Sequence, residues 1–129
     1  MGMYTEFVFG ASLREDTPKH ILEILERMFD GIPKDSDPKF RTIPRGCSYG
    51  FGFSNPLSKL SWDYFHKQRV ISIRCSLKNY NEEIENFVKW IRPYVDRGSG
   101  NRNMLGYSMY ENGEEPKIFY LTEMGVMKP

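Results

Sequence analysis

The chain has 129 residues, of which 40% are hydrophobic and 15% aromatic, which is enough apolar side chain for one α+β domain spanning residues 1–129. Its 18 basic and 17 acidic residues leave a net charge of +1, so no overall field attracts nucleic acid or an anionic membrane. No apolar run could span a bilayer and the start of the chain lacks the features of a secretory signal, so we expect a cytoplasmic protein without membrane contact.

A first strand is predicted at residues 4–13, where large apolar side chains alternate with small or polar ones. Phe7 and Phe9 would face the core of the protein, whereas Glu6 and Val8 would lie on the opposite face of the strand. This alternation is typical of a strand with one buried face.

A helix is predicted to follow this strand. Thr17 would cap its free amide groups, and Pro18 suits the first helical position because its missing donor would be unpaired there. Gly31 would end the helix by adopting a left-handed backbone conformation. The apolar stripe of this helix consists of Ile21, Ile24, Leu25 and Met28.

The middle of the chain is predicted to contain three strands. Residues 32–45, rich in proline and charge, form an exposed connection in which Phe40 and Ile43 pack down on the core. Strands are then expected at three stretches, with a tight turn at Lys67–Gln68 between the last two. These stretches are residues 47–54, 60–66 and 70–77.

A second helix is predicted to begin at a capping Asn81 and to end or kink at Pro93. It is followed by a hairpin with strands at residues 104–110 and 117–121, separated by an Asn-Gly turn sequence. The apolar stripe of this helix consists of Ile84, Phe87, Val88 and Ile91.

Residues 7–28 and 71–92 repeat one pattern. Their strand residues match at a spacing of 64, as from residue 9 to residue 73, and their helix stripes match at a spacing of 63, as from residue 25 to residue 88. The echo indicates two strand–helix units that share one sheet. It reflects either an ancient duplication or two independent solutions to packing a helix on a sheet, and we favour the second.

The elements follow one another in the order β-α-β-β-β-α-β-β, which is typical of the α+β class. Right-handed crossovers place both helices on the same side of a common sheet. We therefore predict a two-layer sandwich in which two helices cover one face of a mixed sheet of about six strands. The order of the strands stays open at this point.

No motif indicates catalysis, a metal or a cofactor, so we expect none of these and interpret enzyme activity as unsupported. His20 and His66 lack the spacing of zinc ligands. The glycine-rich loop at residues 97–102 follows a helix C-terminus, where the dipole disfavours phosphate. Cys47 and Cys75 lie in alternating apolar runs and are interpreted as buried thiols, with a disulfide as the alternative.

The sheet face turned away from the helices is the candidate binding surface. We expect Glu6 and Arg74 on this face, with Asp63 and Arg69 near it. Asp63 and His66 are three residues apart on a predicted strand and should point to opposite faces, so a pair between them is not favoured. The face could dock a second copy, a host protein or single-stranded nucleic acid. Because its carboxylates would repel phosphate, we favour protein, and a simple solvated face is the alternative.

Three stretches resemble a family of small uncharacterised bacteriophage- and prophage-encoded proteins: residues 3–18, 71–80 and 114–121. The resemblance covers most of the chain and implies an accessory protein related to phages, but it assigns no functional residue. We therefore predict a non-enzymatic protein-binding or self-associating accessory module. The alternatives are a small nucleic-acid-binding protein that uses the open sheet face and an enzyme whose site is assembled from dispersed residues.

Overall fold

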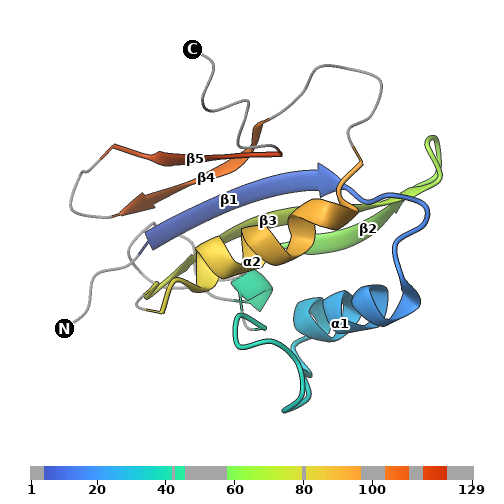
Figure 1. The fold of residues 1–129 in the computed structure, drawn as a ribbon, viewed down its shortest axis with the longest axis horizontal. Helices are drawn as coiled ribbons and strands as arrows, with labels where there is room; N and C mark the ends of the chain where they lie inside the picture. The colour runs from blue at the N-terminus through green and yellow to red at the C-terminus, as the bar shows by residue number, and fades with distance from the viewer. Residues whose placement is uncertain are drawn as a thin grey trace.

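The computed structural model of the protein describes residues 5–41, 43–45, 58–79, 81–96, 104–110 and 115–121. Within these ranges a five-stranded sheet has the order β2-β3-β1-β4-β5. Helices α1 (Lys19–Asp30) and α2 (Glu83–Ile91) lie together on one side of it (Figure 1). The strands are β1 (Thr5–Ser12), β2 (Lys59–Asp63), β3 (Gln68–Leu77), β4 (Met104–Tyr110) and β5 (Lys117–Tyr120), and the short 3₁₀ helices are η1 (Ile43–Arg45) and η3 (Arg92–Tyr94). The predicted α+β class, with two helices on one face of a sheet, is confirmed.

All neighbouring strands of this sheet are antiparallel. Strand β1 lies between β3 and β4, so β1 and β2 run parallel with β3 between them, and β3 and β4 run parallel with β1 between them. The chain thus contains two split β-α-β units, β1-α1-β2 and β3-α2-β4, the arrangement of ferredoxin-like folds. The prediction of a mixed sheet is wrong for the described strands because each helical crossover skips over one strand. The strand expected at residues 47–54 lies outside the described residues.

The echo in the sequence corresponds to the two halves of this topology. Strands β1 and β3, which carry the matched residues, are the central antiparallel pair, with Phe9 opposite Ile73 and Phe7 opposite Cys75. The helix that follows each strand covers the same side of the sheet. The matched residues are therefore those that place a helix on the core face of a strand.

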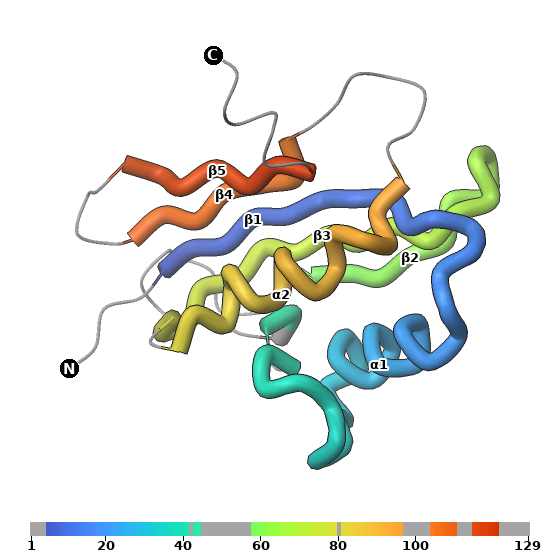
Figure 2. The backbone as a smooth tube through the Cα atoms, in the orientation of Figure 1, coloured from blue at the N-terminus to red at the C-terminus, as the bar shows by residue number. Residues whose placement is uncertain are grey.

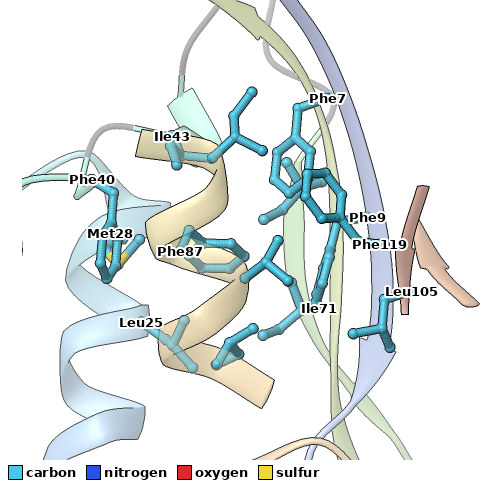
Figure 3. Close-up of a cluster of buried hydrophobic side chains, with 14 of the residues drawn as sticks. Phe7, Phe9, Leu25, Met28, Phe40, Ile43, Ile71, Phe87, Leu105 and Phe119 are labelled. Carbon is cyan, nitrogen blue, oxygen red and sulfur yellow. The ribbon is translucent and has the colours of Figure 1, made fainter. Parts of the chain in front are cut away.

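The core lies between the helices and the sheet, and Phe87 of α2 is near its centre (Figure 3). The centroid of its ring lies 5.5 Å from that of Phe9, 6.1 Å from that of Phe7 and 5.7 Å from that of Phe40. All three contacts are edge to face, the geometry that aromatic quadrupoles favour. Burial of each such side chain contributes about 1.5–3 kcal/mol. The fully buried residues from the helices also include Leu25, Met28, Ile84 and Ile91.

Helix α1 ends as predicted and begins differently. Gly31 has a φ of 76°, and its N–H bonds the carbonyls of Arg27 and Met28. Pro18, not Thr17, is the N-cap residue, and no side chain caps the helix. The Thr17 hydroxyl instead donates to the carbonyl of Arg14 at 2.6 Å. The predicted Thr17 cap is wrong because this hydroxyl stabilises the turn before the helix.

The N-cap residue of helix α2 is Glu82, in a left-handed conformation and without a side-chain cap bond, so the predicted Asn81 cap is wrong. The side-chain oxygen of Asn79, further back in the chain, accepts the N–H of Ile84 at 2.9 Å. The helix ends at Ile91, and Pro93 lies in the 3₁₀ turn that follows, as the sequence predicts.

The carboxylate of Asp37 holds the connection after α1 against that helix. Asp37 is buried and accepts two bonds from the Arg27 guanidinium, at 2.9 and 2.6 Å, and one from the Lys34 N–H at 2.9 Å. The side-chain hydrogen bond from Arg27 is the main cause that lowers the pKa of Asp37 to about 2. Phe40 and Ile43 are buried, which confirms that this segment packs down on the core.

Candidate functional site

The turn that joins β2 and β3 is held by the side chain of Asp63. Its Oδ1 accepts the backbone N–H groups of Phe65 at 2.9 Å and of His66 at 3.2 Å. Its Oδ2 lies 2.8 Å from Nδ1 of His66. The side-chain bond with His66, followed by the backbone bonds, lowers the pKa of Asp63. The carboxylate therefore remains ionised at neutral pH and holds the turn in one conformation.

The prediction that Asp63 and His66 would point apart is wrong, because the strand ends at Asp63. Residues 64–67 form a turn, and Lys67 adopts a left-handed conformation with a φ of 54°. The turn brings the two side chains to the same side, whereas the alternation of a strand would separate them.

This turn presents two aromatic side chains to solvent. Tyr64 is 85% exposed and Phe65 is 87% exposed, whereas Trp62 at the end of β2 is 44% exposed. The Trp62 and Tyr64 rings meet edge to face with centroids 6.5 Å apart, and the Phe65 ring lies 4.8 Å from the His66 ring. The hairpin projects beyond the end of the sheet (Figure 2). We call Trp62, Tyr64 and Phe65 the aromatic tip.

A polar cleft of about 570 Å³ lies at the base of this hairpin. It forms where the end of β1 meets the chain leaving η3, because Leu13 bridges to Val95 and the Asp96 N–H bonds the Ser12 carbonyl at 2.8 Å. Within the cleft the Arg14 guanidinium pairs with Asp16 at 2.9 Å, and the Gln68 amide donates to Asp96. The lining residues are Arg14, Glu15, Asp16, His66, Lys67, Gln68 and Asp96.

The four candidate residues from the sequence fall into three separate places. Glu6 and Arg74 share the sheet face away from the helices, as expected. Arg69 lies on the helix side of the sheet, where it pairs with Glu26 of α1 at 3.6 Å. Asp63 is the last residue of β2, directly before the hairpin turn. The structure therefore joins only two of the four on one surface.

Glu6 has a partner on that surface. The Tyr107 hydroxyl of β4 donates to its carboxylate at 3.2 Å, and burial, followed by the charge of Glu6, raises the pKa of Tyr107. The phenol is thus a neutral donor at physiological pH.

The aromatic tip is the feature that the sequence pattern did not reveal. The alternation from residue 60 onward predicts one strand to residue 66, which would place Tyr64 and Phe65 on opposite faces of a sheet. The signal against this was local: an aspartate can bond backbone groups two residues further on and start a turn. Two adjacent large aromatic residues also break the alternation.

Among the described residues no three histidine, cysteine or acidic side chains gather as metal ligands. Cys75 is fully buried and is a thiol rather than half of a disulfide, whereas Cys47 lies outside the described ranges. In the same part of the chain, neither helix has the length and apolar character needed to cross a bilayer.

The chain matches no family model, no curated protein and no solved structure. The resemblance to phage-encoded proteins therefore stays a hypothesis.

Proposed function

We propose that this protein is a non-enzymatic interaction module that inserts its aromatic tip into an apolar pocket of a partner protein. The observation that supports this is the exposure of Tyr64 and Phe65, at 85% and 87%, on a turn that Asp63 holds in place. Large aromatic side chains dominate binding energy at protein interfaces. A turn that is ordered before binding loses little conformational entropy when it docks.

The charges around the tip favour a protein partner over nucleic acid. Arg14 pairs with Asp16 at 2.9 Å, and Arg69 pairs with Glu26 at 3.6 Å. Nucleic acid binding depends on cations that neutralise phosphates, and carboxylates beside each of these cations oppose it. Binding to an apolar pocket of a protein requires no such cations.

The test compares capture by the wild-type chain with capture by the double variant Tyr64→Ala/Phe65→Ala. Both chains are immobilised and exposed to bacterial lysate, with and without nuclease, and a protein retained by the wild type is then purified for calorimetry. We expect the double variant to bind this partner at least about thirtyfold more weakly, since removing a central aromatic residue typically costs about 2 kcal/mol or more.

The matched control is Ile32→Ala, which removes another exposed apolar side chain away from the hairpin. This variant should bind like the wild type. Equal affinity of the double variant and the wild type would disprove the role of the tip. Capture that disappears on nuclease treatment would assign the chain to nucleic acid binding instead.

A further inference from the structure

His66 connects the carboxylate that holds the hairpin turn to one ring of the aromatic tip. Its Nδ1 lies 2.8 Å from Oδ2 of Asp63. Its own N–H and that of Phe65 bond Oδ1 of the same carboxylate at 3.2 and 2.9 Å. The centroid of its ring lies 4.8 Å from that of Phe65, at an interplanar angle of 78°. A single titratable side chain therefore contacts both the support of the tip and the tip itself.

The bond between the His66 and Asp63 side chains depends on the protonation state of the imidazole. A neutral imidazole has one proton for two nitrogens, so Nδ1 donates in only one of its tautomers. An imidazolium has a proton on each nitrogen, and its charge-assisted bond to a carboxylate is roughly twice as strong as a neutral one. Histidine side chains change their charge between about pH 5 and 8, so this bond can respond to physiological changes in pH.

The other charged groups that face His66 have both signs. They line the cleft beside it and come from the connection between β1 and α1, from the turn itself and from the chain after η3: Arg14, Glu15, Asp16, Lys67 and Asp96. Arg14 is already paired with Asp16 at 2.9 Å. Of the described groups, the Asp63 carboxylate is the one that bonds the His66 ring, and this bond is the main cause that lowers the pKa of Asp63. The two states of the ring therefore differ mainly in how strongly they bind Asp63.

We propose that His66 is a pH-sensitive switch of the aromatic tip: its protonation strengthens the bond to Asp63 and orders the tip, and its deprotonation loosens the tip. This regulation rests on the proposed function, since an ordered tip loses less conformational entropy when it docks. The partner should accordingly be bound more tightly at mildly acidic pH. Because the two side chains are 64% and 30% exposed, water screens the pair, and we expect an effect of about two- to fivefold.

The order of the turn should decrease on both sides of this mildly acidic range. On the alkaline side it decreases as the imidazole loses its proton. On the acidic side it decreases as Asp63 becomes protonated. Since the folded pKa of Asp63 is depressed, its contribution is complete above the ordinary aspartate pKa and is lost as the pH falls through the depressed value. The turn should therefore be most ordered between about pH 4 and 6.

The test measures the exchange of the Phe65 and His66 amide protons with solvent in the free chain, by NMR at about pH 5.5 and about pH 8. Each rate is divided into the intrinsic rate of an unstructured amide at the same pH, which gives a protection factor. In the wild type these factors should be about two- to fivefold higher at the lower pH. His66→Gln removes the titrating group and should have the same protection factors at both pH values.

The matched control is His20→Gln, which removes the other histidine of the chain at an exposed position on α1 and should keep the wild-type pH dependence. Asp63→Asn should lower the protection factors and make them independent of pH. Equal wild-type protection at the two pH values, or an unchanged pH dependence in His66→Gln, would overturn the switch. Because no partner is present, this outcome is separate from the capture experiment, in which equal binding by Tyr64→Ala/Phe65→Ala would disprove the proposed function alone.

Discussion

At the scale of single residues, two aspartates fasten irregular segments to the rest of the protein. Asp37 is buried and accepts bonds from a guanidinium and a backbone amide, because a carboxylate removed from water must be paired. Asp63 binds two backbone amides and His66 at a more exposed position. Asp37 therefore affects stability, whereas Asp63 positions the aromatic tip.

Asp37→Asn should lower the free energy of unfolding at neutral pH, because the amide cannot replace an ionised partner of Arg27. The pKa of Asp37 falls from 3.8 to about 2 in the folded chain, and this shift corresponds to a contribution on the order of 2 kcal/mol. Since the folded pKa is depressed, the contribution is complete above about pH 4 and is lost as the pH falls toward about 2.

The measurement is urea unfolding of the wild type and of Asp37→Asn at neutral and at acidic pH. The difference between them should shrink at acidic pH, where the wild-type carboxyl becomes protonated. Asp35→Asn changes an exposed neighbour of Asp37 and should have the same free energy of unfolding as the wild type at both pH values. A difference that is independent of pH would show that ionisation of Asp37 does not stabilise the fold.

At the scale of elements, the approach of β4 to β1 depends on one glycine. A Cβ atom added to Gly106 would lie 1.9 Å from the carbonyl oxygen of Val8 and 2.8 Å from the Cα of Phe9. Both atoms belong to the backbone, so the two strands would have to separate. Gly106 is also where the pairing of β4 with β5 is irregular.

Gly106→Ala should therefore destabilise the protein by roughly 3 kcal/mol or more, as expected for overpacking against a backbone that cannot yield. Gly10→Ala is the matched control on β1, because its added Cβ would lie 4.0 Å from the Ile71 carbonyl oxygen, an ordinary van der Waals distance. Thermal unfolding followed by circular dichroism measures both variants. Equal melting temperatures for the two would contradict the close approach of β1 and β4.

At the scale of the whole molecule, the two split β-α-β units share one core. Phe87 of the second unit contacts Phe9 of the first and Phe40 from the connection after α1. The Arg92 side chain, after α2, also donates to the Tyr120 carbonyl of β5 at 2.8 Å. Neither unit can bury its apolar face without the other, so we expect them to unfold together.

The two tryptophans allow this cooperativity to be measured. Trp62 reports on the β2–β3 hairpin, and Trp90 on α2, where its ring lies 5.2 Å from that of Phe40. In the single-tryptophan variants Trp62→Phe and Trp90→Phe, the fluorescence and circular dichroism transitions in urea should coincide within each variant. Separate midpoints for the two signals would show that the units unfold independently.

The sequence by itself determined the α+β class, the buried face of β1 and β3, and the apolar stripes of both helices. This information is local, because the period of the apolar residues states which face of an element leaves water. The starts of the helices were determined less well. Thr17 and Asn81 are good caps by type, but the Thr17 hydroxyl bonds the Arg14 carbonyl and the Asn79 side chain accepts the N–H of Ile84.

Only the tertiary structure decided the strand order and which polar side chains meet. Arg69 pairs with Glu26, and Glu6 with Tyr107, across separations that no local pattern encodes. Both follow from crossovers that skip one strand, and this choice depends on how both helices pack on the sheet together. The aromatic tip, by contrast, depends on a local bond: the side chain of Asp63 ends β2 early, so Tyr64 and Phe65 project into solvent, whereas alternation alone would continue a strand.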